Sequence, residues 1–273
     1  MIKFSILASG SSGNAAVICS DETVILIDCG VSAKYLSENL AAMNIKPQDI
    51  AAAVITHAHG DHISSSGLTF CIKNNIKIYS KDEIFDDIYR KFGERLNNCR
   101  AISFNEAFKI RDIEITPFDV HHKDRKVSKT LGFTFVSETG GKRYKIGYVT
   151  DTGKICKDIV SHLADSNILA IESNYDEQML EESFRPYENK KWVLSESGHL
   201  SNKHAAQAIV NVKNASKEKD SLKYVFLTHL SRHHNTSDLA LSASQTALEK
   251  HKIKDVNLFV SPRFTKSKTV VIQ

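Results

Sequence analysis

The sequence predicts an α/β (α+β) protein in which two mixed β-sheets pack on each other with helices on the outside. Short apolar runs rich in Val, Ile, Phe and Tyr, each bounded by Gly, Ser or Asn, dominate the first 60 residues and are typical of strands. Later strands alternate with helical segments, and this order of strand-rich stretch and strand–helix unit occurs twice. The 41% hydrophobic content is that of a globular protein, and since no linker divides the chain, we expect one domain over residues 1–273.

The first half is expected to begin with three strands, at residues 3–7, 15–19 and 23–28, because each is a short apolar run that ends in turn-forming residues. The apolar spacing of residues 31–43 predicts a helix, after which Lys46-Pro47 turns the chain. A continuous apolar run at residues 51–56 predicts a buried strand. The other elements predicted for this half are strands at residues 77–79 and 101–104 and a helix at residues 82–92.

The second half is expected to contain four strands rich in Val, Ile and Phe, at residues 114–120, 131–136, 145–149 and 168–172. A fifth strand at residues 224–228 lies between helices at residues 203–212 and 238–250. These helices follow Ser201 and Thr236, and serine and threonine are preferred N-cap residues. The strands at residues 51–56 and 224–228 are both followed or closed by a Thr-His pair, which alone is too short a repeat to carry an argument.

Charge and cysteine usage limit the compartment and the partners. The 36 basic and 32 acidic residues leave a net charge of +4, which slightly favours a polyanionic partner such as a nucleic acid. Five cysteines without a Cys-x-x-Cys pair indicate reduced thiols rather than disulfides or a cysteine metal site. No apolar run approaches the ~20 residues that span a bilayer, and no signal peptide is recognisable. We therefore expect a cytoplasmic protein without a membrane partner.

The strongest functional signal is the segment THAHGDH at residues 56–62, which places three imidazoles and a carboxylate within six residues after a buried strand. Neutral imidazole and carboxylate suit zinc, manganese or iron, and catalytic sites keep one coordination position open for water. A single histidine is more often solvated than a ligand, but four such groups at this spacing favour a metal site. We expect His57 and His59 to face one ion, and Asp61 and His62, entering the next helix, to face a second.

Two ions need more donors than one loop supplies, and the ends of other predicted strands offer them. Asp151 follows the strand at residues 145–149 and could bridge the ions with one oxygen on each. His229 belongs to the second Thr-His pair. Between His121 and His122, strand alternation favours His122, although Pro117 can shift the register. A solvated histidine is the alternative interpretation for each.

This ordered set resembles the dinuclear site of the metallo-β-lactamase superfamily, and the resemblance covers essentially the whole chain. It implies an αββα sandwich with two divalent ions at the sheet edges, zinc first and manganese or iron(II) as alternatives. Asp28, at the end of an early strand, would support the ligands without touching metal. The implied metal ligands are His57, His59 and His122 for the first ion, Asp61, His62 and His229 for the second, and Asp151 as the bridge.

Three further motifs resemble the YycJ/WalJ-type branch, described as phosphodiesterases that act as 5′ to 3′ exonucleases on double-stranded DNA. The loop ASGSSGN at residues 8–14 could bring backbone amides to an anion, or could be a tight turn between strands. The segments ESNYD at residues 172–176 and GHLSN at residues 198–202 also look like ribonuclease Z, where a glutamate and a histidine form a proton-donating pair. The expected substrate contacts are Ser11, Asn14, Asn174, Ser201 and Asn202.

A proton donor is useful in phosphodiester hydrolysis because the departing sugar oxygen needs a proton that the metals do not supply. We assign that proton to His199, with Glu172 orienting it and keeping it cationic, and we count Asp61 with them as catalytic residues. Ser201, Asn202 and the amides that open the following helix would meet the phosphate, since a helix N-terminus favours anions. A flanking histidine that makes one hydrogen bond is the alternative interpretation of His199.

The chain departs from the branch pattern at two positions. An aspartate is expected after the third metal histidine and a histidine in the ESN motif, where this sequence has Lys123 and Tyr175. The expected metal ligands survive, and the departures bear on ligand support and substrate preference. A basic stretch beside His122 could line a cleft and contact phosphates, or could be solvated surface. Its members are Lys123, Arg125, Lys126 and Lys129, with Arg232 just after His229.

The sequence thus predicts a dinuclear metal-dependent phosphodiesterase, a 5′ to 3′ DNA exonuclease in the first instance, with RNA as an alternative substrate. A small-molecule hydrolase of the same fold, acting on a cyclic phosphodiester, lactone or thioester, is the second hypothesis. Such an enzyme would have little use for Glu172 and His199. A non-catalytic nucleic-acid-binding scaffold is the third, and it would not need a complete set of metal ligands.

Overall fold

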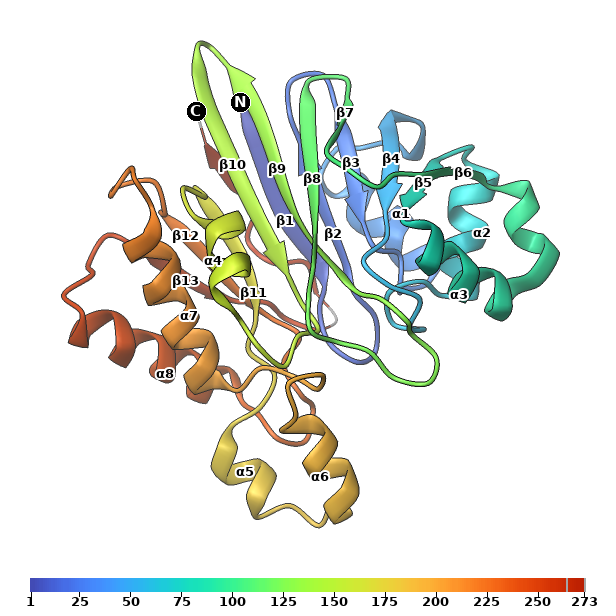
Figure 1. Cartoon of the computed structure of the whole chain (residues 1–273). Coiled ribbons are helices and arrows are strands. Elements are labelled where there is room, and N and C mark those ends of the chain that lie inside the picture. The colour runs from blue at the N-terminus through green and yellow to red at the C-terminus, as the bar shows by residue number, and fades with distance from the viewer. Residues whose placement is uncertain (264, 273) are drawn as a thin grey trace.

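The computed structural model describes residues 1–263 and 265–272, and within them the strands form two seven-stranded sheets that lie face to face (Figure 1). Helices α1 (Ala33–Ala41), α2 (Ser65–Lys73) and α3 (Asp82–Phe92) lie on the side of the first sheet, and α4 (Lys157–Leu163), α7 (Asn202–Ala215) and α8 (Ser237–Lys250) lie on the side of the second. This arrangement is the expected αββα sandwich.

The first sheet is antiparallel at one edge and parallel at the other. Strands β1, β2, β3 and β14 pair antiparallel, whereas β3, β4, β5 and β6 run parallel. Its strands, in spatial order, are β14 (Val270–Ile272), β1 (Ile2–Ala8), β2 (Ala15–Cys19), β3 (Val24–Ile27), β4 (Ile50–Val54), β5 (Lys77–Ser80) and β6 (Arg100–Ser103).

The second sheet has the same mixed character. Strands β10 to β13 run parallel, and β7 to β10 form an antiparallel meander. Its strands, in spatial order, are β13 (Asn257–Val260), β12 (Tyr224–Thr228), β11 (Ile168–Glu172), β10 (Lys142–Val149), β9 (Leu131–Thr139), β8 (Ile113–Asp119) and β7 (Phe108–Ile110). Because β8 and β10 both pair antiparallel with β9, these two strands also end at the same edge.

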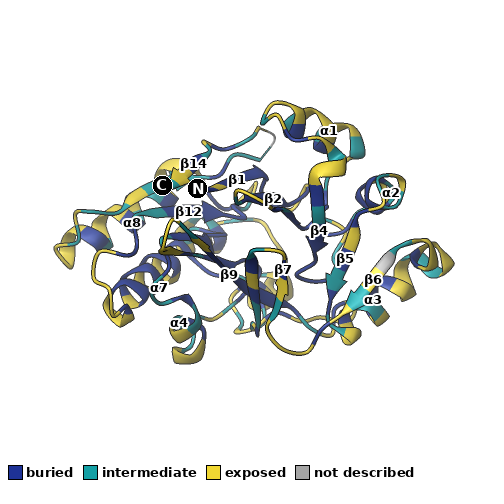
Figure 2. Ribbon diagram, turned by 90° about the horizontal axis from the view of Figure 1, so that it is seen from above, coloured by how far each residue is buried: buried dark blue, intermediate teal, exposed yellow. Residues whose placement is uncertain are grey.

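The main apolar core lies between the two sheets, and Figure 2 shows the strands largely as buried and the helices around them as partly exposed. Phe4 of β1 and Phe226 of β12 meet edge to face across this layer, with ring centroids 5.2 Å apart. A second buried cluster, which includes Leu169 of β11 and Ile209 of α7, fills the space between the second sheet and helices α4, α7 and α8. Each sheet therefore buries apolar side chains, as stacked sheets and helices require.

Two short helices stand apart from this sandwich. Helices α5 (Glu177–Glu181) and α6 (Tyr187–Val193) form a hairpin that projects below the sheets in Figure 1. A small apolar cluster of Tyr175, Leu180 and Val193 joins the two helices to the segment that follows β11.

The predicted elements are present, and four of them (residues 15–19, 82–92, 168–172 and 224–228) have the predicted bounds. One placement was wrong. Asp61 and His62 do not enter a helix but lie in a turn, and α2 begins only at Ser65 after the N-cap Ser64, whose hydroxyl accepts a hydrogen bond from Gly67 N. The structure adds elements that the sequence did not indicate: α4, α5, α6, β7, β13, β14 and the short 3-10 helices η1 (Pro47–Asp49) and η2 (Gly93–Asn98).

The parallel strands decide where functional groups gather. The carboxyl ends of β3, β4, β10, β11 and β12 meet at one edge of the sandwich, and loops at such an edge are the usual place for binding sites in parallel sheets. Among the described residues, no helix combines the length and the apolar character needed to cross a membrane. All five cysteines are free thiols.

Candidate metal centre and active site

Seven side chains from four separate loops lie within reach of shared ions at this edge. Their possible ligand atoms fall into overlapping groups in which all atoms lie within 4.8 Å of one another. The loop after β4 supplies four of the seven, and the loops after β8, β10 and β12 supply one each. The residues are His57, His59, Asp61, His62, His122, Asp151 and His229, and two of them, Asp151 and His229, also form such a group with Glu172 and His199.

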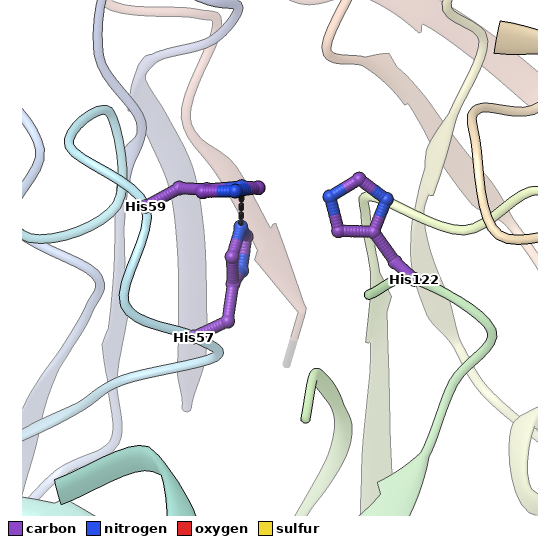
Figure 3. Close-up of side chains that lie close together, drawn as sticks. All are labelled: His57, His59 and His122. Atoms are coloured by element: carbon purple, nitrogen blue, oxygen red, sulfur yellow. Dashed lines mark hydrogen bonds between the residues drawn. The ribbon is translucent and has the colours of Figure 1, made fainter. Parts of the chain in front are cut away.

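The first group consists of three imidazoles. His57 Nε2 and His59 Nδ1 face each other at 3.0 Å, and His122 faces both from the loop after β8 (Figure 3). The ring centroid of His122 lies 5.5 Å from that of His57 and 5.3 Å from that of His59. His121, the alternative to His122 in the sequence, is exposed.

The protonation of this group suits a cation. His122 Nδ1 contacts the carbonyl oxygen of Gly198 at 2.9 Å and must donate a proton to it, which leaves the lone pair on Nε2. This buried Nε2 has no hydrogen-bond partner among the described residues, which is costly unless another group binds there. Burial lowers the pKa of His122, and burial and then His62 lower the pKa of His57 well below its usual value. Both imidazoles are therefore neutral, as metal ligands must be.

The second group mixes charges. His229 Nε2 lies 3.4 Å and His62 Nε2 lies 3.7 Å from Asp61 Oδ2. Although burial opposes it, His62 and then His229 lower the pKa of Asp61 to about 2. Burial also opposes the charged form of His229 and by itself would lower its pKa. The nearby carboxylates, Asp151 first, outweigh burial and raise the pKa of His229 to about 10. The carboxylates at this end of the site thus attract positive charge, which a divalent cation would supply in place of the proton.

Asp151 lies between the two groups. One of its oxygens, Oδ2, is 2.9 Å from His62 Nε2, and the other, Oδ1, is 3.5 Å from His229 Nδ1. The same carboxylate forms a compact group with His57 and His62. Both imidazoles that its oxygens face belong to the second group, and its proximity to His57 joins the carboxylate to the first group, so Asp151 is placed between the two.

Asp28 supports the histidine loop from behind, as a fully buried carboxylate at the end of β3. It accepts hydrogen bonds from Thr56 N at 2.8 Å and from Thr56 Oγ1, and His62 Nδ1 lies 2.7 Å from its Oδ2. Thr56 Oγ1 also contacts His57 Nδ1 at 3.0 Å. Asp28 and Thr56 therefore fix which nitrogens of His57 and His62 point into the site, as partners behind metal ligands generally do.

Backbone conformation at three of these positions is unusual. Asp28, Asp151 and His229 have φ values of 57°, 52° and 55°, in the left-handed region that residues other than glycine rarely adopt. Each follows the carboxyl end of a strand directly or within two residues. This conformation costs roughly 1–2 kcal/mol per residue, and residues so strained concentrate at functional sites. The tight turn lets each chain leave its strand while the side chain stays over the sheet edge.

Glu172 and His199 form the contact that the sequence suggested. His199 Nδ1 lies 2.7 Å from Glu172 Oε1, and the other oxygen of Glu172 accepts hydrogen bonds from Thr152 N and Leu200 N. The same Oε1 lies 3.0 Å from His229 Nδ1. Although burial raises the pKa of Glu172, His199 lowers it below its usual value. The buried carboxylate is therefore anionic and orients His199, whose Nδ1 is 3.7 Å from Asp151 Oδ1.

The expected substrate contacts differ from this pattern. Ser11 is exposed, but the other four are buried and their side chains bond within the protein. Asn14 bonds the loop of Asp61, Asn174 bonds His229 O, and Asn202 bonds Ser173 and Asn235. Ser201 caps α7 as expected by accepting a hydrogen bond from His204 N, and it donates to Glu177. Since Asn202 N also donates to Tyr175 O, these groups support the site from beneath instead of presenting free donors to a phosphate.

Three other residues take part in the site without having been predicted. His59 Nε2 lies 3.2 Å from Asp124 Oδ2, so the aspartate expected directly after the third histidine stands one position later, behind Lys123. The ring of Trp192, from α6, packs edge-on against His122 and His199. Lys91 Nζ donates to Ala58 O and Ile63 O, on either side of the turn that carries Asp61. Asp124 could have been found from the sequence, because it lies one position after the aspartate that the branch pattern expects. No sequence pattern points to Lys91 or Trp192.

Comparison with known proteins places this geometry in a family. A family model described as a β-lactamase superfamily domain matches residues 23–230. The chain belongs to the β-lactamase superfamily. This β-lactamase superfamily member is 29% identical to exodeoxyribonuclease YycJ of Bacillus anthracis, over 91% of this chain and 90% of that protein. It is 30% identical to exodeoxyribonuclease WalJ of Streptococcus pneumoniae, over 87% of this chain and 85% of that protein.

Solved structures agree on the fold of this superfamily member. The metallo-β-lactamase fold protein YhfI of Bacillus subtilis superposes with a TM-score of 0.69 at 14% identity, over 97% of this chain and 98% of that one. The resemblance to YycJ and WalJ is therefore confirmed for the family and the fold. The chain is a metal-dependent hydrolase of this superfamily, and its histidine and aspartate groups are suited to metal binding.

Proposed function

We propose that the protein is a dinuclear metal-dependent phosphodiesterase that hydrolyses nucleic acid, and specifically a 5′ to 3′ DNA exonuclease. The relatives named exodeoxyribonuclease support the substrate class, at about 30% identity over most of the chain. The two donor groups, His57–His59–His122 and Asp61–His62–His229, support two ions, and Asp151 forms compact groups with members of both, with His57 and His62 and with His229. Zinc suits the imidazole-rich donor set, with manganese or iron(II) as alternatives. We also propose that the chain acts as one domain in the cytoplasm, where its five free thiols would stay reduced.

In this proposal His57, His59 and His122 hold one ion, Asp61, His62 and His229 hold the other, and Asp151 contacts both. Ions bound there would polarise the phosphoryl oxygen and make a bound water more acidic.

The chain's own contribution to bond breaking is a proton. The departing sugar oxygen is a poor leaving group without one, and His199 is placed to donate it, since Glu172 holds the ring beside Asp151. The His199–Glu172 contact is the observation that carries the proposal of phosphodiester cleavage. A thioesterase releases a thiolate, the conjugate base of a more acidic group, and has less need of such a pair.

The test uses duplex DNA labelled at its 5′ or 3′ end, with Zn²⁺ or Mn²⁺ present. We expect loss of nucleotides from the 5′ end, no cleavage by His59→Ala, and a rate reduced by about 10²–10⁴ in His199→Ala at unchanged metal content. His251→Ala, at an exposed position after α8, is the matched control and should retain full activity.

Two results would contradict the proposal. Equal rates for His199→Ala and His251→Ala would show that His199 is not the proton donor. Intact DNA in all reactions would favour the small-molecule hydrolase. Elemental analysis of the purified protein counts the ions, and one ion per chain would contradict the dinuclear assignment.

A further inference from the structure

Two hollows are lined by different parts of the loop between β8 and β9, and each has candidate metal ligands in its lining. One, of about 520 Å³, is lined by His122. The other, of about 620 Å³, is lined by His59 and Asp61. We call them the His122 hollow and the His59 hollow. Both are large enough for a nucleotide-sized ligand, since small-molecule sites are typically ~300–1,000 Å³.

The two hollows differ in charge. The His122 hollow has two lysines and three carboxylates in its lining, and Lys129 is already paired with two carboxylates, Glu83 at 3.5 Å and Asp119 at 3.1 Å. The His59 hollow has four cations in its lining and, besides Asp61, one carboxylate, Asp87. A polyanion is therefore attracted to the His59 hollow and gains nothing in the His122 hollow.

The cations of the His59 hollow are not equivalent. Arg90 is paired with Asp87, and Lys91 Nζ donates to two backbone carbonyls beneath the histidine loop. Arg125 and Lys126 are exposed, and neither side chain forms an ion pair with another residue in the described part of the chain. Two cations in a hollow without a protein partner favour an anionic ligand there.

The backbone that carries these two cations is held at the site. Asp124, the residue before Arg125, contacts His59 and accepts hydrogen bonds from Lys126 N at 2.7 Å and Val127 N at 2.9 Å. Ser128 then bonds Asp87 of α3 through both its amide and its hydroxyl. Arg125 and Lys126 thus stand on a segment fixed at both ends, and they line the same hollow as His59 and Asp61.

We propose that the His59 hollow is a subsite for a phosphate group adjacent to the scissile one, with Arg125 and Lys126 as its cations. This inference rests on the proposed nucleic-acid phosphodiesterase function and adds where the substrate's backbone lies. The phosphate is either the terminal phosphate of a 5′-phosphorylated strand or an internal backbone phosphate. Phosphate contacts of this kind position the strand without reading its bases.

The test compares the charge-removing double variant Arg125→Gln/Lys126→Gln with a control pair, Lys142→Gln/Arg143→Gln. The control removes the same charge from exposed positions at the opposite end of β10 from Asp151. Both are assayed with metal on 5′-phosphorylated and 5′-hydroxyl duplexes, by cleavage kinetics and by fluorescence anisotropy binding at several salt concentrations.

We expect a KM and a Kd raised about tenfold for Arg125→Gln/Lys126→Gln at ~0.1 M salt, a salt slope less steep by about 2, and an almost unchanged kcat. Loss of discrimination between the 5′-phosphorylated and 5′-hydroxyl duplexes identifies a terminal phosphate as the ligand. An equal rise on both duplexes identifies an internal phosphate.

Equal KM, Kd and salt slope in the two double variants would overturn the subsite while leaving the proposed function intact. If the wild-type enzyme cleaves no nucleic acid, the proposed function fails, and unaltered DNA binding by Arg125→Gln/Lys126→Gln would overturn the subsite separately.

Discussion

Asp124 shows how a single carboxylate can control the site from outside it. Its Oδ2 is 3.2 Å from His59 Nε2, the nitrogen opposite the one that faces His57. A carboxylate in this position fixes the ring orientation and makes the imidazole a better donor. Removing it would leave His59 free to rotate.

For this reason Asp124→Ala should weaken metal binding by about 10–100-fold, and Asp124→Asn should recover part of the loss because its amide oxygen can still accept a hydrogen bond. Competition with a chromophoric zinc chelator measures the affinity. Asp119→Ala is the control, since Asp119 pairs with Lys81 and Lys129 instead of a histidine. Equal affinities in the two alanine variants would rule out the role of Asp124.

The sequence indicated individual donors where their chemistry is concentrated locally. The segment at residues 56–62 places four candidates in one turn, and Asp151 and His229 follow strong strand signals. Trp192 and Lys91 were not predictable, because they reach the site by tertiary packing of α6 and α3 and carry no local pattern of their own. The burial of Asn202 and Ser201 could not be predicted, because it depends on how α7 packs, and the role of the five expected residues as substrate contacts stays a prediction.

Among the elements, helix α2 shows how close packing can override helix propensity. A Cβ built on Gly67 would lie 1.8 Å from the carbonyl oxygen of Cys29, so the helix can approach the end of β3 only with glycine at this position. The backbone of Cys29 also bonds His62 O and Ser64 N. The packing of α2 therefore helps to fix the histidine loop.

Glycine to alanine in a helix ordinarily stabilises a protein by roughly 1 kcal/mol, but Gly67→Ala should destabilise this one, by about 1–3 kcal/mol. Denaturant unfolding gives the free energy of unfolding. Gly60→Ala is the comparison, because its added Cβ would meet only the flexible end of Lys91, at 3.5 Å. A Gly67→Ala protein as stable as wild type would show that the helix can shift at no cost.

Helices and strands with a long periodic pattern of apolar residues were predicted correctly, and those with a short or weak pattern were not recognised. Helix α3 was predicted with its observed bounds because Ile84 and Ile88 repeat on one face between charged residues. Strands β13 and β14 have three or four residues and exposed or half-buried members, and α5 and α6 have five and seven residues, so none carries enough periodic sequence to be recognised. The helix expected after the histidine loop exists as α2, but it begins at Ser65 after the N-cap Ser64, later than the predicted entry at Asp61 and His62.

At the scale of the whole molecule, the candidate ligands span both sheets. Four come from the loop after β4 in the first sheet, and His122, Asp151 and His229 come from the second. The repeated Thr-His pair follows β4 in one sheet and closes β12 in the other, so the short repeat in the sequence marks equivalent positions in the two halves. Ions bound between them would join the sheets at this edge.

Removing metal with a chelator should therefore lower the Tm by about 5–10 °C, because ligand at 100 times its Kd contributes ~2.7 kcal/mol and each kcal/mol shifts a protein of this size by roughly 2–4 °C. Calorimetry with and without chelator, followed by re-addition of Zn²⁺ or Mn²⁺, measures the change and its reversal. His59→Ala should show a smaller shift on chelation. An unchanged Tm would mean that the sheets are held together without the ions.

The left-handed residues at the strand ends have a practical consequence for protein engineering. Substitution of Asp151 or His229 would relax a strained backbone, but it would also remove a ligand of the proposed ions that join the sheets, so selection for heat resistance gains little at these positions. Substitution of Asp28 would leave Thr56 and His62 without their buried partner. Arg111 and Lys252 have similar φ values, 51° and 58°, but lie outside the site. The substitutions Arg111→Gly and Lys252→Gly should therefore relieve backbone strain and raise thermal stability while hydrolysis is retained.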